Sequence, residues 1–162
     1  KAAQISEKLI GQYDIPVTIL DYVGYGDVKL DNSPGKSFLA LLKDTEVEWQ
    51  DAVFFEQEET RGIRTDRFSY WKRLRTTGEN SLFDLKNDPG QNKDVYGDPK
   101  YMSTISKLDE KLDVFFEQYS DPDYDLWKGG IAKGSVDRPE IFQKLYGKNW
   151  RARAKIKAEF KE

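Results

Sequence analysis

The 162-residue chain contains no cysteine and no histidine. This absence excludes a disulfide framework, a cysteine nucleophile, an imidazole general base and a thiolate zinc site. The redox compartment stays open, because a chain without cysteine suits oxidising and reducing conditions alike. No apolar run approaches the roughly 18 residues that span a bilayer, so we expect a soluble chain with no membrane partner. The chain begins at Lys1 without a signal-like stretch, and we therefore expect a piece of a longer protein.

The residues that are present fit one domain with a core of its own. The apolar fraction is 38% and the aromatic fraction is 14%, which argues against disorder, while 34% of the residues are charged. The 26 basic and 29 acidic residues give a net charge of −3. A chain with this charge is a poor match for a nucleic acid, so we expect no nucleic-acid partner.

The hydrophobic pattern predicts an α+β fold. Four short β-type runs joined by tight turns indicate a small antiparallel sheet of about four strands. These runs occupy residues 52–55, 61–65, 68–74 and 82–85. The apolar period then changes to that of a helix, which predicts a long amphipathic helix over residues 102–119 that covers one side of the sheet.

A short helix is predicted ahead of the sheet. Asp14 is its predicted N-cap, its apolar stripe contains Ile15, Ile19 and Val23, and Gly24 is predicted to end it. The other predicted elements are one or two helical turns over residues 37–42, an aromatic loop over 120–135, and helices over 138–146 and 151–162.

Three aspartates in the last part of the chain have the spacing that opens a calcium-binding loop. They are Asp121, Asp123 and Asp125. That loop also needs Gly at its sixth position and Glu at its twelfth, where this chain has Leu126 and Ala132. A solvated acidic turn is therefore favoured over a calcium site.

An acidic run lies directly before a basic one in the predicted sheet. Glu56, Glu58 and Glu59 are candidates for carboxylate catalysis. The basic side chains that follow are Arg61, Arg64, Arg67, Lys72, Arg73 and Arg75. An acidic strand followed by a basic strand favours cross-strand ion pairs over an active site. The aromatic residues among the basic ones leave an alternative open, a surface for a sulfated or carboxylated glycan.

Five segments in succession carry a family resemblance. Residues 14–25 (DIPVTILDYVGY) resemble D-I-x-P-T-I-L-x-x-x-G-x, with one residue inserted between Pro and Thr. The other four are 34–42 (PGKSFLALL), 49–56 (WQDAVFFE), 61–70 (RGIRTDRFSY) and 82–91 (LFDLKNDPGQ). Together they resemble the C-terminal third of the arylsulfatases, the formylglycine-dependent sulfatases of the alkaline phosphatase superfamily. Residues 121–130 (DPDYDLWKGG) are similar to the tail of bacterial sulfatases that act on sulfated polysaccharides.

This resemblance implies a sheet of four antiparallel strands packed against a long helix, in agreement with the hydrophobic pattern. It also implies that the catalytic machinery lies upstream, where a C/S-x-P-S/A-R motif supplies formylglycine and acidic residues bind calcium. Residues 120–124 are the nearest local match to that motif, and they lack both its small residue and its arginine. We therefore expect no catalytic residue and no metal ligand in this chain, and no activity from the chain alone.

The resemblance further implies a division of the chain into three parts. Residues 1–35 would be the tail end of a larger α/β sulfatase domain, 36–120 the C-terminal subdomain, and 121–162 an aromatic loop with a C-terminal helical extension. The implied partners are the N-terminal sulfatase domain and a sulfated glycan, in a periplasmic or secreted bacterial protein. The alternative is a non-catalytic glycan-binding or interaction module on the same scaffold.

Three residues are predicted to bind the substrate, namely Arg61, Arg64 and Trp127. A basic side chain attracts a sulfate group, and an aromatic one stacks on a sugar ring. The structural alternative is that the arginines pair with Glu56 or Glu58 and that the tryptophan fills a pocket.

Overall fold

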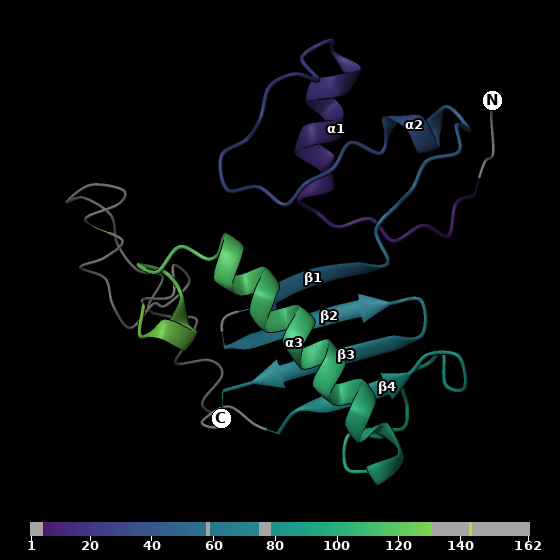
Figure 1. The fold of residues 1–162 in the computed structure, drawn as a ribbon, viewed down its shortest axis with the longest axis vertical. Helices are drawn as coiled ribbons and strands as arrows, with labels where there is room; N and C mark the ends of the chain where they lie inside the picture. Colours follow the sequence, from purple (N-terminus) through teal and green to yellow (C-terminus); the bar gives the residue numbers. More distant parts are fainter. Residues whose placement is uncertain (1–4, 58, 75–78, 131–142, 144–162) are drawn as a thin grey trace, which may run out of the picture. The chain divides into compact units, whose positions relative to one another are not determined.

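The structure is a computed structural model that describes residues 5–57, 59–74, 79–130 and 143. The chain forms two compact units, Lys1–Tyr119 and Ser120–Glu162. The first unit contains a four-stranded antiparallel sheet in the order β1-β2-β3-β4 (Figure 1). Its strands are β1 (Ala52–Gln57), β2 (Thr60–Thr65), β3 (Phe68–Arg73) and β4 (Ser81–Asp84). The α+β prediction is confirmed, and each strand overlaps a predicted run.

A single long helix covers one face of this sheet (Figure 1). Helix α3 (Met102–Tyr119) follows a short 3-10 turn, η1 (Pro99–Tyr101), and has the predicted bounds. The register places Ile63 opposite Phe54 and Tyr70, so alternate side chains of the strands form one apolar layer. That layer and the buried side of α3 form the core, whose buried members are Ala52, Ile63, Tyr70, Leu82, Tyr101, Leu108, Leu112 and Phe116.

Helix α1 (Asp14–Tyr22) ends as predicted but does not begin as predicted. Gly24 has a φ of 90°, a left-handed conformation that suits glycine and terminates the helix. Asp14 is the first helical residue and not the N-cap. The N-cap prediction is wrong because the fully buried carboxylate of Asp14 also has partners far along the chain. It accepts hydrogen bonds from the backbone N–H of Gly11 and of Lys36 and from Nε2 of Gln50, each at 2.8 Å.

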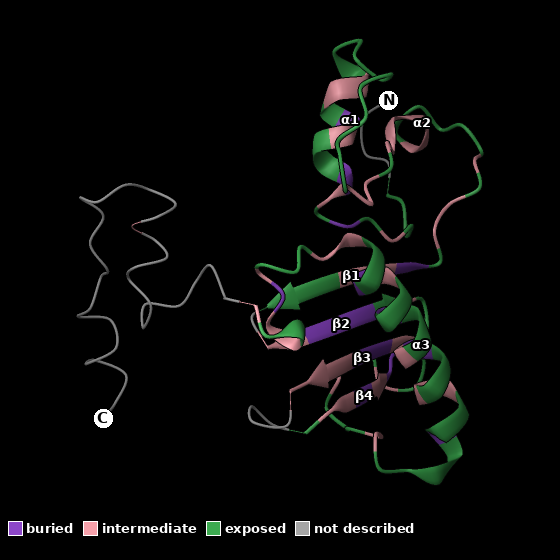
Figure 2. Cartoon of the chain, turned by 60° about the vertical axis from the view of Figure 1, so that its left-hand side comes forward, coloured by how far each residue is buried: buried purple, intermediate pink, exposed green. Residues whose placement is uncertain are grey.

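The predicted apolar stripe of α1 is exposed (Figure 2). Ile15, Ile19 and Val23 are 47%, 57% and 56% exposed. Helix α2 (Leu39–Leu42), the predicted helical turn, contains no buried residue. The start of the first unit thus presents apolar side chains outward, which is unusual for a surface helix.

The second unit contains the 3-10 turn η2 (Leu126–Lys128) within the predicted aromatic loop. The helices predicted over residues 138–146 and 151–162 lie outside the described residues, apart from Gln143. Within the described ranges, none of the helices has the length and apolar character of a bilayer span.

Candidate functional site

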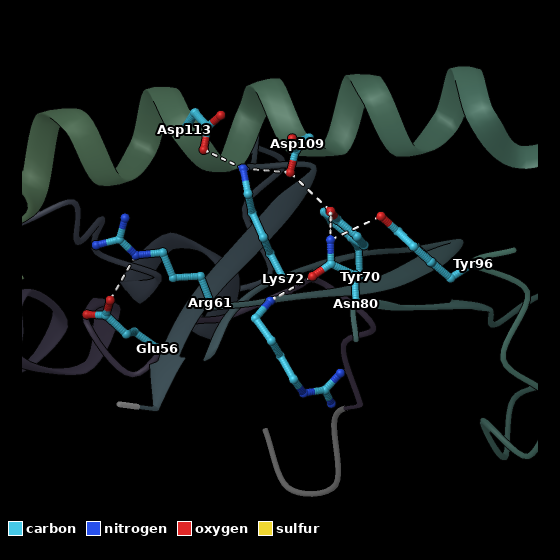
Figure 3. Close-up of polar contacts among 9 residues, drawn as sticks. Glu56, Arg61, Tyr70, Lys72, Asn80, Tyr96, Asp109 and Asp113 are labelled. Carbon is cyan, nitrogen blue, oxygen red and sulfur yellow. Dashed lines mark hydrogen bonds and ion pairs between the residues drawn. The ribbon is translucent and has the colours of Figure 1, made fainter. Parts of the chain in front are cut away.

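Strand β2 positions the two predicted substrate-binding arginines on opposite faces of the sheet. Arg61 lies on the face covered by α3, where its guanidinium carbon is 4.1 Å from the ring centroid of Phe116. Its Nε donates to Oε1 of Glu56 at 2.8 Å, and the residue is only 7% exposed (Figure 3). Arg61 and Glu56 are direct neighbours in the register. The predicted cross-strand ion pair is therefore confirmed for this arginine, whereas Glu58 and Arg75 lie outside the described residues.

Arg64 has a different environment. It lies opposite Val53 on β1 and Ser69 on β3, and its side chain is exposed. Because side chains alternate along a strand, residues 61 and 64 point to opposite sides. The two arginines therefore do not line one common site.

A polar network fixes α3 to the sheet beside Arg61. Nζ of Lys72 lies 2.8 Å from Asp109 and 2.9 Å from Asp113, both on α3 (Figure 3). The hydroxyl of Tyr70 donates to Asp109 at 3.0 Å, and Asn80 donates to that hydroxyl at 3.3 Å. Burial, together with the Asp109 carboxylate, raises the pKa of Tyr70 far above its ordinary value. Burial alone would lower the pKa of Lys72, but its two carboxylate partners raise it overall. Near neutral pH, Lys72 is therefore charged and Tyr70 is neutral, and in these forms both bind Asp109 and stabilise the packing of α3 on the sheet.

A second polar cluster surrounds the buried carboxylate of Asp84, at the end of the edge strand β4. Asp84 is 2% exposed and accepts hydrogen bonds from Arg67, from the Tyr101 hydroxyl at 3.1 Å and from Asn87 at 2.9 Å. The hydrogen bond from Arg67 is the largest of the effects that lower the pKa of Asp84 to about 2. A carboxylate that stays ionised this strongly cannot act as a general acid near neutral pH.

The carboxylates of two of the three aspartates of the second unit bind its local backbone. Oδ1 of Asp121 accepts from the backbone N–H of Asp123 at 3.0 Å, and Oδ1 of Asp125 accepts from that of Trp127 at 2.9 Å. Asp125 is buried, so the acidic turn is less solvated than predicted. Among the described residues there is no group of three or more Asp, Glu, His or Cys that could hold a metal ion. Trp127 is the second residue of η2 and is half-buried.

The first unit also contains a cavity of about 460 Å³ that the sequence did not reveal. It lies between the segment that contains Tyr13 and the C-terminal end of α3. The rings of Phe54 and Phe115 stack at its wall with centroids 4.0 Å apart, and the Tyr13 hydroxyl accepts from the backbone N–H of Phe54. Burial raises the pKa of Tyr13. The polar lining of the cavity comes mainly from Lys36, Gln50, Asp51, Glu110, Lys111 and Gln118.

A four-stranded antiparallel sheet with one covering helix, joined by ion pairs such as Arg61–Glu56, defines a small α+β domain. The sequence model of the family described as "N-sulphoglucosamine sulphohydrolase, C-terminal" matches residues 1–118. The chain therefore belongs to this family of sulfatase C-terminal domains.

Individual relatives agree with the family. The chain is similar to the N-acetylglucosamine-6-O-sulfatase of Bacteroides thetaiotaomicron, with 26% identity over 146 residues that cover 83% of this chain and 26% of the relative. It is also similar to the Delta 4,5-hexuronate-2-O-sulfatase of the same organism, with 32% identity over 74 residues, covering 46% and 15%. The chain thus spans about a quarter or less of the length of these relatives.

The fold is also similar to that of a solved structure named as a different kind of hydrolase. The phosphonate monoester hydrolase of Agrobacterium radiobacter superposes with a TM-score of 0.57 at 26% identity, covering 72% of this chain and 27% of that one. Sulfate and phosphonate monoesters both present a tetrahedral anion. A similar fold therefore occurs in a protein named as a phosphonate monoester hydrolase.

Proposed function

We propose that the chain is the C-terminal portion of a sulfatase that hydrolyses sulfate esters of a glycan or polysaccharide. The observation that carries this proposal is the family match over residues 1–118. The relatives add support, because both are sulfatases whose names specify sulfated sugars. In this proposal the complete protein is the sulfuric ester hydrolase, and the present chain contributes fold and substrate contacts.

The groups that carry out hydrolysis are proposed to lie upstream, in the part of the protein that the relatives possess and this chain does not span. Formylglycine requires a modified cysteine or serine in a motif that the sequence does not contain. Formylglycine would supply the nucleophile and calcium would stabilise charge on the sulfate oxygens. No step of that chemistry is assigned to a residue of this chain.

We also propose a division of the chain into three parts. Residues 1–35 are assigned to the larger upstream domain, 36–120 to the sheet-and-helix subdomain and 121–162 to an extension. The exposed apolar residues of the first part support this division, and they are Ile15, Ile19, Tyr22, Val23, Tyr25, Val28 and Leu30. Full burial of one such side chain stabilises a protein by about 1.5–3 kcal/mol. A partner surface is therefore expected over α1, and the upstream domain is the partner we propose.

Substrate contacts are proposed for Arg64, Trp127 and Arg61, in that order of support. The Arg64 side chain is exposed, whereas Trp127 is half-buried, so Arg64 is the more accessible of the two to a ligand. Arg61 has the weakest support, because Glu56 and Phe116 already occupy its guanidinium.

The proposal is tested by assaying the complete polypeptide and the 162-residue chain side by side. Release of inorganic sulfate from sulfated glycosaminoglycan oligosaccharides is measured with and without calcium, and a phosphonate monoester is assayed in parallel. We expect sulfate release by the complete polypeptide and none by the chain alone. Turnover that depends on residues of the isolated chain would refute the upstream assignment. Binding without hydrolysis by the complete polypeptide would favour the non-catalytic module, and exclusive phosphonate hydrolysis would replace the sulfatase assignment.

A further inference from the structure

The face of the sheet opposite α3 has a charge pattern of its own. This outer face consists of the side chains that alternate with the core layer. They are Val53, Phe55, Gln57, Thr60, Gly62, Arg64, Ser69, Trp71, Arg73, Ser81 and Phe83. The strand carboxylates, Glu56 and Asp84, lie on the other face, where they bond to Arg61 and Tyr101. The strands therefore give the outer face two arginines and no carboxylate.

Two aromatic rings lie at the centre of the outer face. Phe55 and Trp71 flank Gly62 in the register, and their rings meet edge to face with centroids 5.8 Å apart. A Cβ at position 62 would come within 2.0 Å of the Phe55 ring, so a side chain there would displace this ring. Gly62 thus lets the Phe55 ring lie across the strand. Phe55 is 37% exposed, so part of the pair is accessible to a ligand.

The neighbouring polar groups hold this aromatic pair in place. The indole Nε1 of Trp71 donates to Oγ of Ser69 at 2.9 Å. The Arg73 guanidinium carbon lies 5.4 Å from the Trp71 ring centroid, and its Nη1 donates to Oγ of Ser81 at 3.0 Å. Arg64 is the diagonal neighbour of Trp71, since it lies opposite Ser69 on β3. Diagonal neighbours in an antiparallel pair are about 7–8 Å apart, a separation that one sugar ring spans.

We propose that this outer face binds an anionic glycan. The Phe55–Trp71 pair stacks on the apolar face of a sugar ring, and Arg64 binds the sulfate or carboxylate group of that sugar or its neighbour. Arginine suits this role because its planar guanidinium donates two parallel hydrogen bonds to such a group. Charge complementarity supports the choice of an anionic chain over a neutral one. The choice of a sulfated glycan as probe rests on the proposed function, whereas the aromatic and basic surface does not.

The test measures binding directly and does not depend on hydrolysis. The complete polypeptide is titrated with a size-defined heparin oligosaccharide and with an unsulfated heparosan oligosaccharide of equal length. The variants are Arg64→Gln, Phe55→Ala and Trp71→Ala, and the matched control is Lys107→Gln, which removes one positive charge from an exposed position on α3. Melting temperatures verify that each variant is folded.

We expect Arg64→Gln to weaken heparin binding by about tenfold or more, since a hydrogen bond to a charged group contributes on that scale. Lys107→Gln should change it less than about twofold, as is usual for an exposed charge away from the ligand. Phe55→Ala and Trp71→Ala should weaken binding of both oligosaccharides, because stacking does not require the sulfate.

Equal heparin affinities for Arg64→Gln and Lys107→Gln would overturn the proposal. So would a Trp71→Ala or Phe55→Ala variant that melts earlier but binds heparin as the wild type does, because the aromatic pair would then serve packing alone. If the wild type binds heparin through Arg64 but releases no sulfate from any substrate, the glycan surface stands and the proposed function fails. If the complete polypeptide hydrolyses sulfate esters and Arg64→Gln binds heparin as the wild type does, the proposed function stands and the glycan surface fails.

Discussion

Arg61 and Glu56 face each other across β1 and β2 and are joined by a hydrogen bond of 2.8 Å. The arginine side chain is 8% exposed and the glutamate side chain 37% exposed, so the pair lies at the boundary between core and solvent. Its guanidinium also covers the Phe116 ring of α3. One side chain therefore connects an edge strand, its neighbour and the covering helix.

This relationship predicts a stability defect for Arg61→Ala. The substitution removes the ring contact and the charged hydrogen bond, and we expect the free energy of unfolding to fall by about 2 kcal/mol. Arg61→Lys keeps the charge but loses the planar stacking, and should recover part of the loss. Urea unfolding of the three proteins measures this. If Arg61→Ala keeps its stability but loses glycan affinity, the residue binds substrate and its packing role is wrong.

Asp84 predicts a pH dependence of stability. Hydrogen bonds, that from Arg67 first, hold its pKa in the folded protein at about 2, below the ordinary value of 3.8. The ionised carboxylate therefore stabilises the folded state fully above about pH 4, and this contribution is lost as the pH falls towards 2. Asp84→Asn should lower stability at pH 6 and show a smaller further loss between pH 4 and 2.

The check is the difference between wild type and Asp84→Asn in unfolding free energy, measured from pH 2 to 6. Other carboxylates with lowered pKa values, such as Asp51 and Asp88, are present in both proteins and cancel in this difference. A difference that stays constant with pH would show that Asp84 contributes through shape and not through its charge.

Asp14 predicts a second buried-polar effect, this one on the attachment of the N-terminal segment. Asp14→Ala leaves three donors, from Gly11, Lys36 and Gln50, without their shared acceptor. Each unsatisfied donor costs about 1–3 kcal/mol, so we expect a loss of about 3 kcal/mol or more. Asp27→Ala, at an exposed position in the following loop, is the matched control and should be nearly neutral.

Amide hydrogen exchange measures the consequence locally. In Asp14→Ala, protection should fall across α1 while the amides of β2 and β3 keep theirs. A uniform loss of protection over the sheet would mean that the N-terminal segment and the sheet unfold as one unit, contrary to the proposed boundary near residue 35.

The sequence predicted the elements that depend on local periodicity. Short β-type runs joined by tight turns predicted the strands, and the helical period of Leu108 and Leu112 predicted α3. The acidic run before the basic run predicted the Glu56–Arg61 pair, because residues close to a tight turn pair across it.

What the sequence could not predict depends on distant contacts. Asp14 was interpreted as a cap because Lys36 and Gln50, its partners, lie far along the chain. Arg61 and Arg64 are predicted together as substrate-binding residues, but only the packing of the core decides that α3 covers the face with Arg61 and leaves Arg64 exposed. The cavity beside Phe115 likewise requires two segments that no local pattern relates.

The exposed stripe of α1 predicts opposite outcomes in the isolated chain and in the complete polypeptide. Ile19 is 57% exposed here, so Ile19→Asp should change the stability of the isolated chain by less than about 0.5 kcal/mol. If the upstream domain covers α1, the same substitution places an unpaired charge in an apolar interface of the complete polypeptide. There we expect a loss of about 3 kcal/mol or more and a lower soluble yield. Met102→Asp, at a position that is 68% exposed at the start of α3, is the control and should be tolerated in both proteins. Melting temperatures and size-exclusion profiles of the four variants measure this. If the complete polypeptide tolerates Ile19→Asp as well as Met102→Asp, the upstream domain leaves α1 uncovered. If the wild-type chain forms dimers that Ile19→Asp disrupts, a second copy of the chain covers the stripe instead.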